Sequence, residues 1–595
     1  MAASAPSAPT AAATADDDKL IVYQLLPRLF TNSSTTNKPW GTPQENGVGK
    51  FEQITDKALA EMKALGITHM WYTGIIEHAT MTAYPGLPAD DADVVKGRAG
   101  SPYAIRDYYD VDPDLATSPD KRMQEWEALI KRTHKAGMKV VMDFIPNHVA
   151  RSYHSDAKPA GVVDLGEKDD RTKTFASNNN FYYLPGQAFV VPKQSNPLGE
   201  AIAPGEDGKY AENPAKATGN DVFSAAPSLN DWFETCKLNY GWDYQGGQKI
   251  PHFDPVPDTW VKMRDILIYW AAKDVDAFRC DVAEMVPVEF WAWCIPEVKR
   301  ARPQVKFIAE IYNPAAYHRY VEVRKFDYLY DKVGLYDRLR ELMAGGGSTG
   351  KLDFIWQTES RGIERNMYRF LENHDEQRIA SPQFSGNPRT AIPGMTVTAL
   401  LNKGPVMLYF GQEVGEPGTD AEGFSSADGR TSIFDYWGVP QHQKWLNGGK
   451  FDGGKLAPEQ KELRAFYGKL LNLCHQPVIR AGEFYGLHFA QEHGQAAGYD
   501  DQRCYAFLRY TATDRLLVVV NFDRDKAHDA TLKIPEAALK TLGLPTTGQL
   551  RFTDQLLTSR ELAVAAADLF APASTRGLKV GLPPLSAAVF RIAAK

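Results

Sequence analysis

Short apolar runs alternate along this chain with segments in which apolar residues return every three or four positions. The continuous apolar run at residues 21–25 predicts a buried strand. A helical repeat from Leu59 to Leu65 ends at Gly66, and residues 67–72 form a second strand-like run. The pattern therefore predicts a strand, a helix and a second strand at the start of the folded part of the chain.

The same alternation continues further along the chain. Residues 123–130 carry another helical repeat, which begins after Ser118 and ends at Gly137, and residues 139–144 form the next strand-like run. A later helix is predicted to begin with Asp258 as its N-cap. Further strands are predicted at residues 275–278, 305–309, 367–371 and 406–410.

Strands that are apolar on both faces and alternate with helices are typical of parallel βα units. About eight such units over about 450 residues favour a closed (β/α)8 TIM barrel over an open doubly wound sheet. We therefore expect an α/β protein built on a (β/α)8 barrel.

Breaks in this rhythm divide the chain into predicted domains. Residues 1–18 are predicted to be a disordered leader, because small and polar residues dominate there and large apolar residues are scarce. The barrel is predicted to comprise residues 19–149 and 256–476. Residues 150–255, rich in Asn, Gly, Pro and Asp, are predicted to form an insertion domain after the third strand. From 477 to 595, strands and turns predict an antiparallel β-sandwich.

The composition argues against some classes of partner. Hydrophobic residues make up 43% of the chain and charged residues 24%, as in ordinary globular proteins. The formal net charge is −7, so no broad basic surface is expected for nucleic acid or an anionic membrane. No apolar run approaches the roughly 20 residues of a membrane helix. A neutral partner such as a carbohydrate fits this balance, and the 12 Trp and 27 Tyr include rings able to cover sugar faces.

Cysteine usage and the N-terminal segment bear on location. The five cysteines are scattered without a CxxC pair, which predicts mainly buried thiols and leaves one disulfide open. Residues 1–18 resemble the small-residue tail that follows a signal peptide, so we expect a periplasmic or secreted protein. A disordered cytoplasmic leader is the alternative.

Four carboxylate-bearing runs each lie at the end of a predicted strand. They are DFIPNH at 143–148, FRCD at 278–281, FIAE at 307–310 and ENHD at 372–375. In a barrel the loops that follow the strands form the pocket, so catalytic groups are expected there. Retaining glycoside hydrolysis needs a nucleophilic carboxylate, a carboxylic acid facing it and polar groups that hold the sugar. The four runs together supply these groups.

The order of these runs resembles the signature regions of the α-amylase family of glycoside hydrolases, and the resemblance spans about residues 20–595. It implies that Asp281 is the nucleophile and that Glu310 protonates the leaving oxygen and then activates water. It also implies that Asp375 is the third carboxylate, which binds hydroxyls of the sugar being cleaved.

The resemblance implies further groups that hold the substrate. Arg279 lies two residues before Asp281, on the same face of the strand, and should keep that carboxylate ionised. His148 and His374 resemble the hydroxyl-binding histidines of the family. Asp143 is expected to orient Arg279 rather than react.

Other positions bear on specificity. Tyr103 matches the ring that stacks under the sugar, and Ala104 follows it where relatives that remove single glucose units commonly have Asp, which argues against a strict exo-glucosidase. Asn230 resembles the neopullulanase and oligo-1,6-glucosidase types, and the run at 281–284 resembles the neopullulanase and cyclodextrinase pattern. Tyr312 is placed to stack on the leaving or acceptor sugar.

No cofactor is expected for the chemistry itself, but the resemblance raises the question of structural calcium. Many family members bind calcium between barrel and insertion domain, and Asn147 matches one ligand. Ser228 stands where a ligand Asp is common, and Asn32 and Asn37 faintly resemble a second site. Calcium therefore stays unassigned.

The leading hypothesis is an enzyme that cleaves α-1,4 bonds of starch-like glucans or maltooligosaccharides with retention of configuration. An α-glucanotransferase, in which a sugar replaces water as acceptor, is the alternative. A non-catalytic carbohydrate-binding member of the fold is disfavoured because all three carboxylates are present. The oligomeric state stays open.

Overall fold

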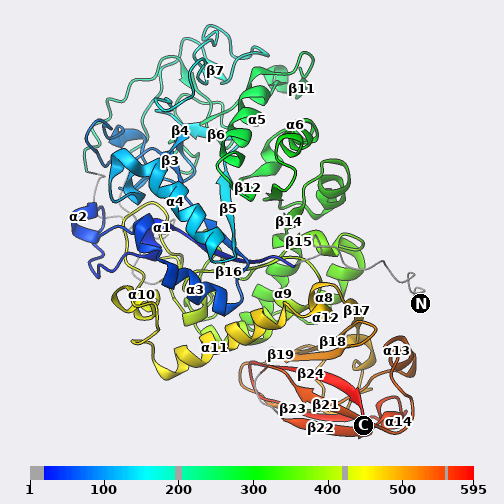
Figure 1. The fold of residues 1–595 in the computed structure, drawn as a ribbon. Coiled ribbons are helices and arrows are strands. Elements are labelled where there is room, and N and C mark those ends of the chain that lie inside the picture. Colours follow the sequence, from blue (N-terminus) through cyan, green and yellow to red (C-terminus); the bar gives the residue numbers. More distant parts are fainter. Residues whose placement is uncertain (1–18, 194–203, 419–426, 557–559) are drawn as a thin grey trace.

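Eight parallel strands close into a barrel in the computed structural model, which describes residues 19–193, 204–418, 427–556 and 560–595 (Figure 1). The predicted leader lies outside the described residues. Arg369, just beyond the seventh strand, bridges Val406 of the eighth, where Met407 N donates to the Arg369 carbonyl at 2.8 Å. This contact closes the ring and confirms the (β/α)8 fold. The barrel strands are β1 (Ile21–Leu25), β2 (His69–Tyr72), β5 (Lys139–Phe144), β12 (Ala277–Cys280), β13 (Lys306–Ala309), β14 (Tyr328–Tyr330), β15 (Met367–Tyr368) and β16 (Val406–Tyr409).

Side-chain alternation along the strands separates the barrel interior from the layer beneath the helices. In β1, Tyr23 packs outward into the core shared with the helices, whereas Val22 packs inward among residues from the other strands. The inward set is dominated by large apolar side chains, so the barrel is filled rather than hollow. Its members include Val22, Trp71, Val141, Ala277, Ile308, Tyr330, Tyr368 and Met407.

The helices agree with the predicted repeats apart from two N-termini. The helix predicted to begin after Ser118 begins at Arg122, because Pro119–Lys121 form a separate 3-10 turn. Gly66 ends the first predicted helix in a left-handed conformation with φ of 104°, which favours glycine. Asp258 is the first residue of its helix and not the N-cap, which is Pro257, so that prediction was wrong. The helices are α1 (Pro27–Phe30), α2 (Pro43–Asn46), α3 (Asp56–Leu65), α4 (Arg122–Lys135), α5 (Asp258–Ala271), α6 (Val288–Ala301), α7 (Asp337–Met343), α8 (Lys351–Phe354), α9 (Ala391–Leu400), α10 (Pro440–Leu446), α11 (Pro458–Leu473) and α12 (Pro477–Arg480), with α13 (Glu536–Thr541) and α14 (Ala566–Leu569) nearer the C-terminus.

The segment between β5 and α5 leaves the barrel as short antiparallel pairs, which we call the insertion segment (residues 150–255, at the top of Figure 1). A small apolar core there includes Leu184, Phe189 and Ala215. The pairs are β6 (His148–Ala150) with β9 (Thr235–Lys237), β7 (Tyr183–Leu184) with β8 (Ala215–Lys216), and β10 (Trp242–Asp243) with β11 (Ile250–Pro251). Earlier in the chain, β3 (Ile76–His78) pairs with β4 (Ile105–Val111).

Two antiparallel sheets form the C-terminal sheet domain, residues 477–595, which begins with α12 and lies beside α11 at the lower right of Figure 1. One face of the six-stranded sheet, with Phe507 and Val518, joins the barrel core, whereas the other, with Leu508 and Val519, packs in a separate core with the two-stranded sheet. The six strands are β17 (Glu483–Gly486), β18 (Cys504–Tyr510), β19 (Arg515–Asn521), β24 (Ser586–Ala594), β21 (Gln549–Asp554) and β22 (Glu561–Ala565), and the two are β20 (His528–Leu532) and β23 (Leu578–Leu582).

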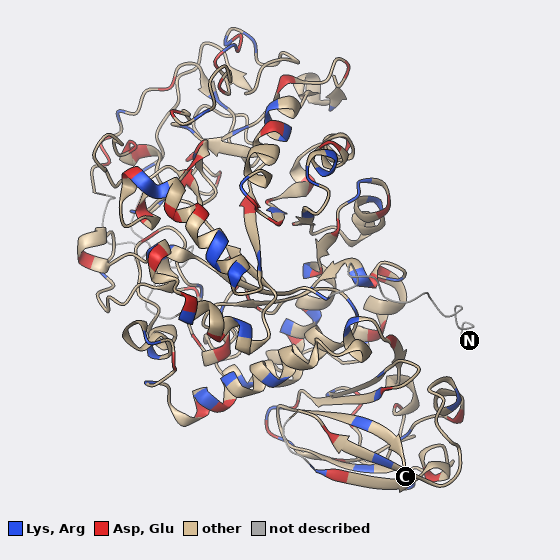
Figure 2. Ribbon diagram, viewed as in Figure 1, with Lys and Arg blue, Asp and Glu red and all other residues tan. Residues whose placement is uncertain are grey.

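Charge and cysteine placement agree with the composition. Figure 2 shows both signs of charge interspersed along the helices of the barrel. All five cysteines are buried and free. Within the described part of the chain, no helix combines the length and apolarity needed to cross a membrane.

Candidate active site

The carboxyl ends of the barrel strands bring the predicted catalytic side chains together. Inward-pointing Ala277 is followed at two-residue spacing by Arg279 and then Asp281. Inward-pointing Ile308 is followed at the same spacing by Glu310. Since β12 and β13 are parallel neighbours, these polar groups meet at the same end of the barrel.

Arg279 is the centre of a buried charged network. Its Nη1 donates to Asp281 Oδ1 at 2.7 Å and to Asp143 Oδ1 at 3.3 Å, and its Nη2 pairs with Glu310 Oε1 at 2.7 Å. Its side chain is fully buried. The planar guanidinium thus places one nitrogen beside each of the two predicted catalytic carboxylates, through a hydrogen bond to Asp281 and an ion pair with Glu310.

Three aromatic rings surround the Arg279 guanidinium. The ring centroids of Trp71, Tyr103 and Tyr330 lie 5.6, 5.5 and 5.5 Å from its carbon. Trp71 Nε1 also donates to Asp143 Oδ2 at 2.8 Å. Sequence reasoning missed Trp71 and Tyr330, whose only signal is an inward position on a barrel strand.

His374 and Asp375 form the other side of the site with Tyr103. The His374 Nε2 atom lies 3.0 Å from Asp375 Oδ2 and 2.5 Å from the Tyr103 hydroxyl, and the two rings stack with centroids 5.1 Å apart. Gln24 Nε2 lies 2.8 Å from His374 Nδ1, and the Asp375 N–H donates to Asn373 Oδ1 at 2.9 Å. Gln24 and Asn373 were not predicted as site residues.

Glu310 is held by groups on three sides. Besides Arg279, the Tyr312 hydroxyl donates to Oε1 at 2.6 Å and the Val282 N–H donates to Oε2 at 2.7 Å. Val282 has a φ of 35°, a costly conformation for a β-branched residue. The chain accepts this strain directly after Asp281, where the turn aims the Val282 N–H at Glu310.

Glu284 fixes the loop that carries Tyr312. Its Oε2 accepts from the Tyr312 N–H at 2.9 Å and its Oε1 from the Asn313 N–H at 3.0 Å. Tyr312 remains 38% exposed, so its ring borders the solvent while its hydroxyl contacts Glu310.

The network shifts the pKa values of two predicted catalytic carboxylates in opposite directions. Burial raises the pKa of Asp281 well above its ordinary value, the charge of Arg279 opposes that rise, and the charge of Glu310 adds to it. Because the two carboxylates share one guanidinium, they titrate as a pair that retains one proton, and cleavage requires that this proton lie on Glu310 when Asp281 attacks. The pKa of Asp375 is lowered, because the charge and hydrogen bond of His374, together with Arg279, outweigh its burial.

The other two predicted binding residues differ in placement. Burial and the charge of Lys237 lower the pKa of His148 to about 3 against a hydrogen bond to the Tyr103 backbone, so its imidazole is neutral at pH 7. Asn230 lies in an exposed turn of the insertion segment, outside the network, and its role stays a prediction.

The surroundings of Asn147 do not fit calcium. Its Oδ1 accepts from Lys237 Nζ at 2.9 Å, and its Nδ2 donates to the Gly219 carbonyl at 2.7 Å. Lys237 is buried and also pairs with Asp221. Calcium requires several oxygen ligands, whereas here the chain places its own ammonium group against both oxygens.

The second suggested calcium position is also occupied by the chain's own hydrogen bonds. Asn32 Nδ2 donates to the Trp437 carbonyl at 3.0 Å, and Asn37 Oδ1 accepts from the Gly438 N–H at 2.7 Å. Both amides tie the segment after β1 to residues 437–438.

The family model described as "Alpha amylase, catalytic domain" matches residues 24–325, which is more than half of the chain. The chain belongs to the α-amylase family. The matched part of this α-amylase family member includes Asp281 and Glu310, and Asp375 lies beyond it.

The chain is also similar to two curated relatives and to one solved structure. It is 26% identical over 407 residues to an α-amylase of Streptomyces lividans, covering 63% of this chain and 41% of that one. It is 22% identical over 416 residues to a cyclomaltodextrin glucanotransferase of Geobacillus stearothermophilus, covering 66% of this chain and 49% of that one. The chain thus spans less than half the length of either relative. The noncanonic maltogenic α-amylase AmyB of Thermotoga neapolitana has the same fold, with a TM-score of 0.59 and 20% identity over 97% of this chain and 99% of that one.

Proposed function

We propose that this α-amylase family member cleaves α-1,4-glucosidic bonds of starch-like glucans or maltooligosaccharides with retention of configuration. The observation that carries the proposal is the contact of both Asp281 and Glu310 with the single guanidinium of Arg279, each at 2.7 Å. Retaining glycosidases need two carboxyl groups about 5–5.5 Å apart on either side of the bond that is cleaved. The two terminal nitrogens of the Arg279 guanidinium hold the carboxyl groups of Asp281 and Glu310 close to each other.

In the first step, an oxygen of Asp281 forms a bond to the anomeric carbon while the bond from that carbon to the leaving oxygen breaks. The proton on Glu310 passes to the leaving oxygen, so the shortened glucan departs as an alcohol. In the second step, water gives a proton to Glu310 and its oxygen to the anomeric carbon. The bond to Asp281 breaks and the starting protonation state returns.

The remaining groups hold the sugar ring as positive charge develops on it. Asp375 carries a lowered pKa and is ionised at neutral pH, and its side chain is 33% exposed, so it can accept hydrogen bonds from sugar hydroxyls. Neutral His148 has its Nδ1 3.2 Å from Asn147 Nδ2, so its other ring nitrogen is the one available to a sugar hydroxyl. Tyr103, packed on His374, offers an aromatic face.

The choice of acceptor separates hydrolysis from transglycosylation. The Tyr312 hydroxyl donates to Glu310 Oε1 and the residue is partly exposed, so a leaving or incoming sugar can pack on its ring. An α-glucanotransferase is therefore the second candidate. Ala104, which is buried in a small apolar cluster beside Tyr103, offers no carboxylate to bind a terminal glucose, and this favours substrates longer than one sugar.

Product analysis tests both candidates. We expect maltoheptaose to give shorter maltooligosaccharides whose first-formed reducing ends are α-anomers in proton NMR, with Asp281→Ala inactive. Initial β-anomers would refute retention. Products longer than maltoheptaose, or cyclic products, would establish the transferase, and pullulan cleavage would show tolerance of α-1,6 links.

A further inference from the structure

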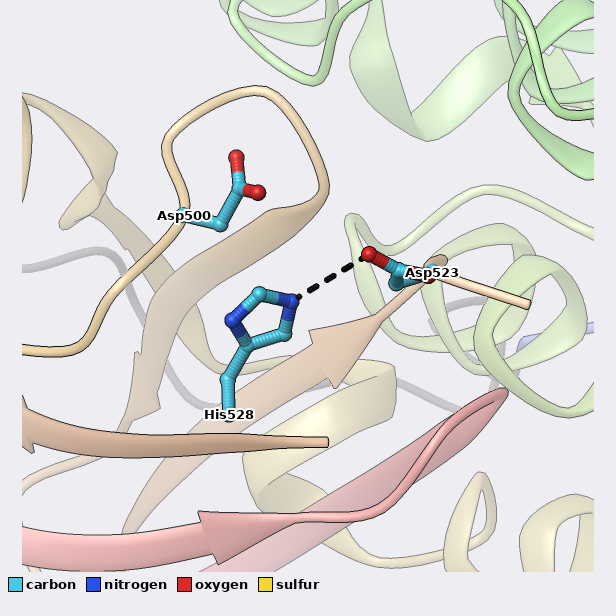
Figure 3. Close-up of side chains that lie close together, drawn as sticks. All are labelled: Asp500, Asp523 and His528. Atoms are coloured by element: carbon cyan, nitrogen blue, oxygen red, sulfur yellow. Dashed lines mark ion pairs between the residues drawn. The ribbon is translucent and has the colours of Figure 1, made fainter. Parts of the chain in front are cut away.

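Three side chains in the C-terminal sheet domain converge on one point outside the active site (Figure 3). Asp500 precedes β18, Asp523 follows β19 and His528 begins β20. One potential ligand atom from each side chain lies within 4.8 Å of the other two. The three groups therefore come from separate segments and both sheets of the domain.

The hydrogen bonds of the two carboxylates leave one oxygen of each available. Asp500 Oδ1 accepts from the Gln502 N–H at 2.9 Å. Asp523 Oδ1 accepts from the N–H groups of Asp525 and Lys526 at 3.1 and 3.0 Å. These backbone contacts fix both carboxylates in place, and within the described residues Asp500 Oδ2 accepts no hydrogen bond.

His528 gives a second indication of a bound ligand, independent of the two carboxylates. Its side chain is only 4% exposed, and its Nε2 has no hydrogen-bond partner among the described residues. The nearest charged atom is Asp523 Oδ2 at 3.5 Å, which is longer than an N–H···O hydrogen bond. A buried imidazole nitrogen without a partner is costly unless another group binds it.

The 3.5 Å distance between His528 Nε2 and Asp523 Oδ2 suits two atoms that bind the same metal ion. Zinc ligands lie about 2.0–2.2 Å from the metal in tetrahedral sites, which places two ligand atoms roughly 3.3–3.5 Å apart. Imidazole favours zinc and neighbouring transition metals over calcium and magnesium, which prefer oxygen alone. The charge of two carboxylates also balances that of a divalent ion.

We propose that Asp500, Asp523 and His528 bind a divalent transition metal ion, zinc in the first instance, with water completing its coordination. The ion joins the two sheets of the C-terminal domain. It also steadies the loops that contact the barrel, because Arg503 Nη2 donates to the Gly345 carbonyl at 2.8 Å and Arg524 Nη2 to the Ser385 carbonyl at 2.6 Å. The site is structural and independent of the glycosidase proposal.

Metal titration of the purified full chain tests the site. After chelator treatment and desalting, isothermal titration with zinc chloride should show one site with a Kd of about 1 µM or tighter, and zinc should raise Tm by several degrees. His528→Gln should weaken zinc binding at least tenfold and abolish the rise in Tm. His318→Gln is the matched control, because His318 pairs with Glu322 on an exposed surface, and it should bind zinc as the wild type does.

Several outcomes would overturn the proposal. Equal zinc affinity in wild type and His528→Gln would place the metal elsewhere, and saturation by calcium but not zinc would contradict the ligand chemistry. If His528→Gln fails to fold, Asp500→Asn, at a partly exposed turn, provides the same comparison. Maltoheptaose turnover should be unchanged in these folded variants, which separates failure of this site from failure of the proposed activity.

Discussion

Replacing Arg279 with lysine keeps a positive charge at the centre of the site but removes the fork that contacts two carboxylates. A single ammonium nitrogen cannot reproduce both 2.7 Å contacts to Asp281 and Glu310. Losing one charge-assisted hydrogen bond costs about 1.5–3 kcal/mol. If that loss falls on the transition state, kcat/KM for maltoheptaose decreases by roughly 10- to 150-fold.

The pH profile of Arg279→Lys gives the sharper test. Burial raises the pKa of Asp281 and the charge of Arg279 opposes the rise. Lysine opposes the rise less than arginine does, so the pKa of Asp281 increases further. The nucleophile then takes up a proton at higher pH, and the acid limb of the kcat/KM profile moves to higher pH.

Arg369→Lys is the matched control, because Arg369 pairs with buried Asp331 at 2.9 Å outside the network. It should lower stability without moving the acid limb. An Arg279→Lys enzyme with kcat/KM within about threefold of wild type and an unmoved acid limb would refute the proposed role of the guanidinium.

Three further predictions concern calcium, the contact of Lys237 with Asn147, and pH. Lys237 Nζ contacts Asn147 Oδ1, so we expect no calcium site there. Millimolar calcium should leave the Tm of wild type unchanged in calorimetry and its activity unchanged in maltoheptaose assays. A calcium-dependent rise in Tm or in activity would contradict this interpretation. Lys237→Met should lower the free energy of unfolding by about 1–3 kcal/mol in urea titrations, because it leaves a buried acceptor unpaired, and an unchanged value would count against that contact. His148 has a folded pKa of about 3 and an ordinary value of 6.5, so only the unfolded chain gains its proton between these pH values and stability falls as pH decreases. His148→Gln should therefore reduce the slope of unfolding free energy against pH by up to about 1.4 kcal/mol per pH unit in this window, and equal slopes would refute the neutral buried state.

Most of the barrel could be predicted from the sequence because each strand is apolar on both faces and each is paired with a helical repeat. β14 was missed because it has only three residues, between Asp327 and Asp331. Predicted strand 367–371 is shorter in the structure, where β15 covers only Met367–Tyr368 and Arg369 continues as a single bridge.

The catalytic candidates could be predicted because they lie in short motifs at strand ends. Their contacts could not, because these depend on the arrangement of neighbouring strands and on side-chain rotamers. Tyr103 was expected beneath a sugar, but its contacts with His374 and Arg279 arise only when distant segments meet. Lys237 likewise lies far along the chain from Asn147, and no local pattern indicates that its ammonium reaches that amide.

The most direct test of the account is the identity of the residue that carries the glycosyl intermediate. Glu310→Gln should form the intermediate from α-maltosyl fluoride, because fluoride leaves without an acid, but should hydrolyse it slowly for lack of a base. Intact mass spectrometry followed by peptide mapping should then find one maltosyl group on Asp281, and Asp281→Ala should carry none. A maltosyl group on another residue, or no adduct despite fluoride release by Glu310→Gln, would contradict the assignment of Asp281 as nucleophile.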